Sequence, residues 1–291
     1  MTVPSISKTS ANGSGTFNFN GGIFSSSSTT LNISTGLLIS FIVKSGGAIF
    51  DIPSGYANTF SPNLITDATS TGGGFTKQGP GTLTFGGTAS TYTGQCQILE
   101  GTLAVTGVNN NSANGVFGNN ALPIILGSNG KSATLSLPSS VGLTKNITLA
   151  TGASCNLVVP NTSISGNISG SGSLTIASGA NVSILGNNTF AGGLTLNSGN
   201  FYPQTNSSFG AGSISINAAC IIKAYTTALT FSNSLIINSD FSFLAATNEK
   251  TITFNGPVTL TGTRSINNQI GASSLEAVVF SNVINDGGNN Y

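Results

Sequence analysis

The chain has 291 residues, carries a formal net charge of +1, and only 5% of its residues are charged. Ordinary soluble domains contain roughly 25% charged residues, so hydroxyl and amide side chains must supply most of the polar surface. The eight basic residues form no cluster, which excludes an electrostatic site for nucleic acid or an anionic membrane. The longest apolar run, about seven residues, is too short to insert into a membrane.

Short runs that alternate apolar and hydroxyl residues predict β-strands along the whole chain. In chain order they lie at 16–19, 31–34, 48–52, 82–85, 97–99, 102–105, 134–137, 146–150, 174–176, 182–185, 194–196, 213–216, 229–231, 251–254 and 258–260. A period of two predicts that one face of each strand is buried and the other is wet. More continuously apolar segments at 37–43, 122–126, 156–159, 235–237 and 277–280 indicate a folded core rather than disorder. A capped helical period of ten residues occurs nowhere, so we expect essentially no helix.

Glycine, asparagine and serine fill the gaps between these runs, as expected for tight bends. A sandwich or barrel also fits many short strands. The very short strands, the scarcity of Asn-Gly hairpin dipeptides and the recurrence of similar strings at long intervals favour a solenoid. We therefore predict an all-β fold, a right-handed parallel β-helix with roughly twenty to twenty-five residues per coil and about twelve to fourteen coils in a rod about 60 Å long.

The expected domain organisation is simple. Residues 1–15 are expected to form a loose or capping N-terminal segment, and residues 16–291 a continuous β-helix. Similar strings near 74–105 and 170–201 are interpreted as repeat copies. The C-terminal string VFSNVINDGGNNY ends where another copy is expected to begin, so we expect the solenoid to continue beyond residue 291 in a longer parent.

Few residues qualify for catalysis or for binding a metal or cofactor. The chain has no histidine, which removes His-based triads and His-ligated metals. Of the scattered acids, only Asp51 and Asp67 are close enough in sequence to meet on successive coils, and we interpret both as solvated turn residues. The stretch Asp286–Gly288 resembles a calcium turn but lacks nonapeptide repetition. We expect no catalytic residue, no cofactor and no metal site.

Other candidate features are weaker still. Cys96, Cys155 and Cys220 lack metal or redox spacing; Cys96 and Cys155 alternate with apolar residues and are expected to point inward, although a disulfide between adjacent coils stays open. A carbohydrate-stacking surface would depend on tyrosines, since there is no tryptophan: the candidates are Tyr56, Tyr92, Tyr202 and Tyr225. Sequons for glycosylation begin at Asn32, Asn146, Asn161, Asn167, Asn181 and Asn206, and chance alone produces them in such an Asn-rich and Ser-rich chain.

The string GFTKQGPGTLTFGGTASTYTGQCQILEGTLAV at 74–105 resembles the autotransporter-associated β-strand repeat, also called the passenger-associated transport repeat. The residues that carry the resemblance are Gly74, Thr76, Lys77, Gly79, Gly81, Thr82, Leu83, Tyr92, Thr93, Gly94, Ile98, Gly101, Thr102 and Leu103. Phe75 replaces the usual Leu, and Gln95, Cys96 and Gln97 replace the usual Gly and Thr. We expect the matching residues to be structural, with Lys77 ending a turn and laying its stem across the coil edge.

This resemblance implies a β-helical passenger displayed at the cell surface. We expect a non-enzymatic structural or adhesive segment of a large secreted protein, such as a stalk or an extracellular fibre. The alternatives are a self-assembling filament subunit and a polysaccharide-degrading module like a phage tailspike. The expected location is extracellular or at the cell surface, although no signal peptide is visible. The expected partners are other copies of the chain or cell-surface and matrix ligands.

Overall fold

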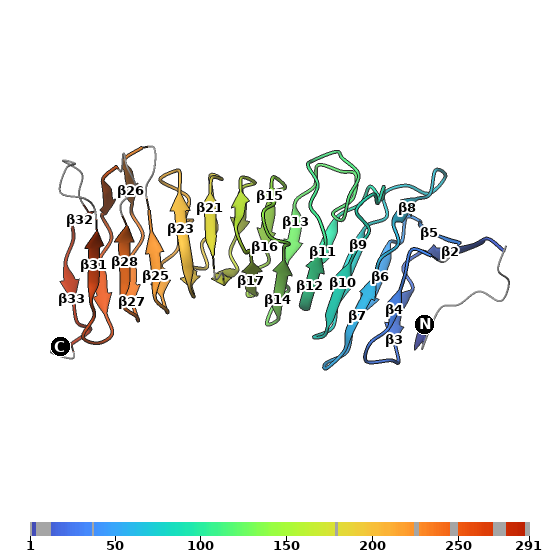
Figure 1. The fold of residues 1–291 in the computed structure, drawn as a ribbon, viewed down its shortest axis with the longest axis horizontal. Coiled ribbons are helices and arrows are strands. Elements are labelled where there is room, and N and C mark those ends of the chain that lie inside the picture. The colour runs from blue at the N-terminus through green and yellow to red at the C-terminus, as the bar shows by residue number, and fades with distance from the viewer. Residues whose placement is uncertain are drawn as a thin grey trace.

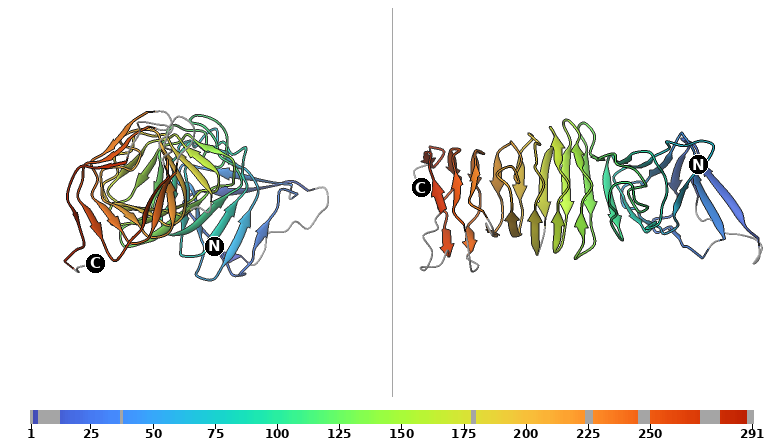
Figure 2. Two further views of the ribbon diagram at one scale, coloured as in Figure 1. Left: turned by 60° about the vertical axis from the view of Figure 1, so that its left-hand side comes forward. Right: turned by 90° about the horizontal axis from the view of Figure 1, so that it is seen from above.

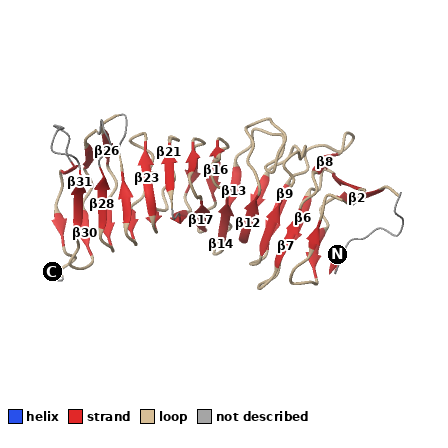
Figure 3. Ribbon diagram, viewed as in Figure 1, coloured by secondary structure: helices blue, strands red, loops and turns tan. Residues whose placement is uncertain are grey.

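The computed structural model describes residues 2–3, 13–36, 38–177, 180–223, 227–244, 250–269 and 278–288. Throughout these residues the chain winds into an elongated β-solenoid with no helix, as predicted (Figures 1 and 3). All strand pairs between adjacent coils are parallel. None of the described segments could cross a membrane as an apolar helix.

One sheet, here called the long sheet, extends from one end of the rod to the other. It contains twelve strands, and each new coil adds one strand to it. In chain order they are β4 (Asn32–Ile33), β7 (Ala57–Phe60), β10 (Thr82–Phe85), β12 (Gly101–Val105), β14 (Ser132–Ser136), β17 (Ser154–Val158), β20 (Ser173–Ala177), β22 (Leu194–Leu196), β24 (Ile214–Ile216), β27 (Leu235–Ile237), β30 (Val258–Leu260) and β33 (Ile284–Asn285).

Four shorter sheets form the other faces. The first lateral sheet contains β1 (Thr2–Val3), β3 (Ile23–Ser26), β6 (Ala48–Asp51), β9 (Phe75–Gln78), β11 (Cys96–Ile98), β13 (Ile124–Leu126), β16 (Ile147–Leu149) and β19 (Ile168–Gly170). The second lateral sheet contains β15 (Gly142–Leu143), β18 (Thr162–Ile164), β21 (Asn181–Ile184), β23 (Gly199–Pro203), β25 (Cys220–Ile222), β28 (Phe241–Leu244) and β31 (Ile266–Gln269). A short N-terminal sheet contains β2 (Gly15–Phe19), β5 (Ile39–Val43) and β8 (Leu64–Thr66), and a short C-terminal sheet contains β26 (Leu229–Phe231), β29 (Ile252–Phe254) and β32 (Val278–Phe280).

The sheets surround a common interior, as the view turned toward the rod axis shows (Figure 2). Coil length varies along the rod: Leu157 pairs with Ile176 after 19 residues, whereas Leu103 pairs with Leu135 after 32. The longer coil accommodates the strand-free segment 106–123. The rod has about eleven turns, fewer than the predicted twelve to fourteen, because the prediction divided all 291 residues into coils whereas the long sheet begins at Asn32 and ends at Asn285.

Alternation along each strand builds the core. Strands such as β10 and β20 bury every second residue, so inward side chains stack on those of the next coil. In the N-terminal half the interior is aromatic: the ring centroids of Phe24 and Phe50, which are partners on adjacent coils, lie 5.4 Å apart, and those of Phe75 and Phe85, on two sheets of one coil, lie 5.1 Å apart. Such contacts add about 0.5–1.5 kcal/mol per pair beyond the burial of area.

Part of the predicted N-terminal segment can be placed. Strand β1 pairs with β3, with Thr2 opposite Ser25, so the start of the chain covers one sheet edge at this end of the rod. Residue 1 and residues 4–12 of that segment lie outside the described residues.

Exposed asparagines form ladders along the corners. The side-chain oxygen of Asn146 accepts the backbone N–H of Asn167 at 2.9 Å, and that of Asn167 accepts the N–H of Asn187 at 2.8 Å. Each rung satisfies a backbone donor where the chain leaves a sheet. Asparagine side chains in these ladders therefore stabilise the turns by accepting hydrogen bonds from the backbone of the next coil.

Candidate functional site

The repeat segment is the strongest candidate in the sequence, and its glycines share one structural property. They lie where adjacent coils approach so closely that a Cβ atom would overlap an oxygen of the neighbouring coil. The glycines and the residues whose oxygens they approach are Gly74 (Gln95), Gly79 (Asp51 and Ile52), Gly81 (Pro53), Gly94 (Gly72) and Gly101 (Gly79). The repeat thus has glycine at the positions where one coil lies in close contact with the next.

The apolar residues of the repeat point inward. Leu83, Ile98 and Leu103 are buried, and Leu83 lies opposite Leu103 in the long sheet. Tyr92 is also fully buried, and its hydroxyl donates to the carbonyl of Val116 at 2.8 Å. Burial of Tyr92 removes it from the predicted carbohydrate-stacking residues.

Thr76 lies on the opposite, outer side of β9. It is half-exposed and pairs with Ile49 and Gln97 on the neighbouring strands. Its role in the repeat is therefore that of an outward β-former.

Lys77 does not lie across the coil edge as expected; its whole side chain is inside the core. Its Nζ donates to the carbonyl oxygens of Gln78 at 3.0 Å, Gly79 at 2.7 Å and Glu100 at 3.0 Å. Glu100 belongs to the following coil, so the ammonium joins two coils from within. Burial lowers the pKa of Lys77 to about 8, although the carboxylates of Asp51 and Glu100 oppose the shift.

The structure contains a second inward lysine that the sequence reasoning missed. Lys145 is 1% exposed, and its Nζ donates to the backbone carbonyl of Asn120 at 2.6 Å and to its side-chain oxygen at 3.1 Å. Burial lowers the pKa of Lys145. A signal was available: the string GLTK at 142–145 matches GFTK at 74–77.

Buried amides at the corners were also missed. Asn120 donates to the carbonyl of Gly94 at 2.7 Å, Asn188 to that of Ser208, and Asn233 to that of Gly210. Each satisfies a carbonyl where the chain turns without a strand. Their sequence neighbourhoods do not distinguish them from the many exposed asparagines.

The two repeat copies occupy different faces of the rod. In the first copy, the strand-free segment 86–95 runs from the long sheet (β10) to the first lateral sheet (β11). In the second, the strand-free segment 185–193 runs from the second lateral sheet (β21) to the long sheet (β22). Both segments insert one fully buried ring, Tyr92 or Phe190. The copies share this inserted ring but are offset by one face.

The two acids that could have formed a catalytic pair have separate surroundings. Asp51 ends β6 in the first lateral sheet and lies opposite Gln78. Asp67 follows β8 in the short N-terminal sheet and accepts Lys44 Nζ at 2.7 Å, and this hydrogen bond holds the pKa of its carboxyl well below the usual range. They do not stack on successive coils, because Asp51 and Asp67 lie on different faces.

Among the described residues, no three or more acids and cysteines gather as metal ligands. The carboxylate of Asp286 accepts the backbone N–H of Gly288 at 2.8 Å and so closes a local turn.

The three cysteines are free and buried, so no disulfide joins the coils. Cys96 lies in β11, Cys155 in β17 and Cys220 in β25, which belong to three different sheets. Burial raises the pKa of each thiol to about 12. The expectation that Cys96 and Cys155 point inward is confirmed.

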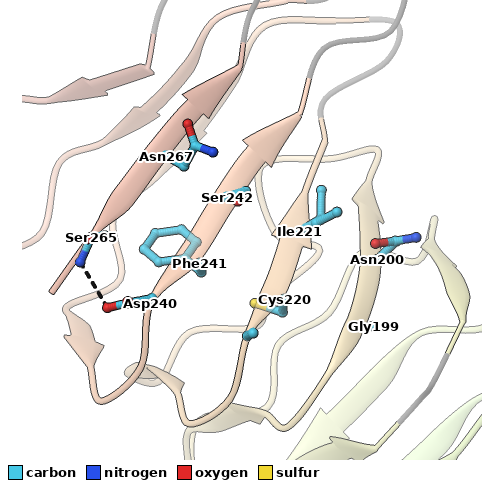
Figure 4. A pocket seen from close by; sticks show the side chains of 10 residues that line it. Gly199, Asn200, Cys220, Ile221, Asp240, Phe241, Ser242, Ser265 and Asn267 are labelled. Carbon is cyan, nitrogen blue, oxygen red and sulfur yellow. Dashed lines mark hydrogen bonds between the residues drawn. The ribbon is translucent and has the colours of Figure 1, made fainter.

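An open groove of about 490 Å³ crosses the second lateral sheet over β23, β25, β28 and β31 (Figure 4). Its lining is neutral except for Asp240, whose carboxylate accepts the backbone N–H of Ser265 at 2.9 Å. A single carboxylate cannot supply the acid and base pair of a glycosidase.

The two other described tyrosines, Tyr56 and Tyr202, have different surroundings. Tyr202 donates to Asn181 at 3.0 Å, and Lys223 Nζ lies 5.4 Å from the centre of its ring. Tyr56 packs against the core, and Tyr225 lies outside the described residues.

Comparison with known proteins adds one match. The family model of the passenger-associated-transport-repeat matches residues 75–105. No curated protein and no solved structure matches the chain. The inward Lys77, the buried Tyr92 and four of the five close-contact glycines lie within the matched residues; Gly74 directly precedes them. Residues 75–105 are therefore similar to the passenger-associated-transport-repeat.

Proposed function

We propose that this chain is a rigid structural segment, a stalk or fibre portion, of a protein displayed outside the cell. The observation that carries the proposal is the long sheet, which continues from β4 to β33. A rod in which each coil contacts only its neighbours can hold another part of a protein at a fixed distance. The matched repeat supports an autotransporter passenger-like segment and a secreted or surface location.

The chemistry of the described surface supports a structural role over an enzymatic one. A polysaccharide-degrading module needs carboxylates that act together. Asp51 and Asp67 lie on different faces, and Asp240 is the only acid lining its groove. These observations favour the structural role over the tailspike-like alternative.

Protease shaving of intact source cells tests the main proposal. Mass spectrometry of the released peptides should find this chain, and immunoblotting should show it within a much larger surface-exposed parent. If the chain is protected from protease and present as an intracellular species near 29.1 kDa, the proposed location and stalk role are both wrong.

A further inference from the structure

The outer side of the long sheet carries a column of threonines in strict register. Thr82 lies opposite Thr102 and Thr102 opposite Thr134; two coils further on, Thr175 lies opposite Thr195. Asn156 connects the two groups, since it pairs with Thr134 on one side and Thr175 on the other. Neighbouring strands lie about 4.8 Å apart, so the column presents side chains at that spacing over about 24 Å.

The hydroxyls of these threonines are available to an external partner. All five side chains are half-exposed, and none of these hydroxyls hydrogen-bonds to another described residue. Ladders on other faces behave differently: the hydroxyls of Thr148 and Ser169 lie 3.4 Å apart and bond each other. The threonine column is thus a row of regularly spaced, unused donors and acceptors.

The columns beside the threonines are uncharged. On one side Ser132, Ser154 and Ser173 follow one another, and on the other Ala104, Ser136 and Val158 do, with Val158 37% exposed. The twelve strands of the long sheet contain no charged residue, and their aromatic side chains, such as those of β7 and β10, point inward. The face is therefore rigid, low in relief and neutral.

We infer that this face binds ice. A regular row of weak, uncharged contacts binds a flexible solute poorly, because ordering the solute costs free energy. When the partner is itself a rigid lattice, this cost is absent and the free energies of the individual contacts add. Ice is such a rigid and uncharged lattice, and each of its water molecules is both a hydrogen-bond donor and an acceptor, as is each threonine hydroxyl. The lack of outward aromatic rings argues against crystalline polysaccharide, and the lack of charge argues against mineral surfaces and polyelectrolytes.

The inference goes beyond the proposed stalk, since a stalk needs no particular outer face. It is tested by growing ice slowly from a solution of the 291-residue chain and comparing the protein content of ice and liquid, together with thermal hysteresis. The test variant is Thr175→Lys, which places a hydrated cation in the middle of the column. The matched control is Thr253→Lys, because Thr253 is also half-exposed and outward but lies in β29, on the short C-terminal sheet.

We expect the unchanged chain and Thr253→Lys to enter the ice and to show thermal hysteresis, and Thr175→Lys to lose most of both. Circular dichroism and elution volume establish that each variant is folded. Exclusion of the unchanged chain from ice overturns the inference, as does equal partition of Thr175→Lys and the unchanged chain. Retention on crystalline chitin or cellulose without entry into ice also overturns it and assigns the face to a polysaccharide.

Discussion

Replacing Gly101 by alanine should destabilise the rod more than a single added methyl group normally does. The φ angle of Gly101 is 70°, which an L-residue adopts at a cost of about 1–2 kcal/mol. Its Cβ would also overlap the carbonyl oxygens of Gly79 and Gly81 and the carbonyl carbon of Pro80. These are backbone atoms of the adjacent coil and cannot rotate away, so overpacking adds about 1–3 kcal/mol. The expected loss is about 2–5 kcal/mol in total.

Gly130 provides the control. Its φ is also 70°, but nothing lies within 4 Å of an added Cβ. Gly130→Ala should therefore cost only the backbone term, about 1–2 kcal/mol. The assay is urea unfolding followed by circular dichroism, with comparison of midpoints at unchanged slope. Equal losses in the two variants would refute the interpretation of the repeat glycines as close coil contacts.

Three further predictions concern buried polar groups. The pKa of Lys77 falls from 10.5 to about 8 on folding, so between these two pH values the folded state binds fewer protons than the unfolded state. The free energy of unfolding should therefore rise with pH in this range, by up to about 3 kcal/mol. Lys77→Met should remove this part of the rise in urea midpoints, and an unchanged pH profile in the variant would contradict the prediction. Tyr92→Phe should lower the free energy of unfolding by about 1–2 kcal/mol, because it leaves the Val116 carbonyl without its donor. The control Tyr202→Phe, at a more exposed tyrosine, should change the free energy of unfolding by less than about 0.5 kcal/mol. Equal effects of the two substitutions in thermal unfolding would contradict this prediction. The three buried thiols, with pKa values raised to about 12, should resist iodoacetamide in the native protein and react in urea; native labelling seen by intact-mass analysis would show that they are accessible.

Much of the fold could be predicted from the sequence because alternation alone reports which side of a strand is buried. Runs such as 82–85 and 194–196 became strands with the bounds expected. Strands such as β15 and β33 were missed because they have two residues each, too few for a period to be visible. Pairing with the neighbouring coil, a long-range property, holds them extended.

The candidate site was predictable as a structural motif but not in its internal geometry. The glycine spacing marked the close contacts, yet Lys77 was expected at the coil edge because lysine is rarely buried unless it is paired. The structure satisfies its ammonium with three backbone carbonyls, which no sequence pattern displays. The sequence also did not show which faces of the rod the copy at 170–201 occupies. This copy contains an additional strand, β21, which shifts the strands after it by one face relative to the first copy.

Small-angle X-ray scattering of the purified chain tests most directly whether it is a continuous rigid rod. The twelve strands of the long sheet, spaced by about 4.8 Å, predict a sheet about 50 Å long. We expect a pair-distance distribution with an early maximum at the width of the rod and a long, nearly linear decay. A symmetric distribution of a globular particle, or the scattering of a flexible chain, would contradict both the solenoid and the stalk built on it.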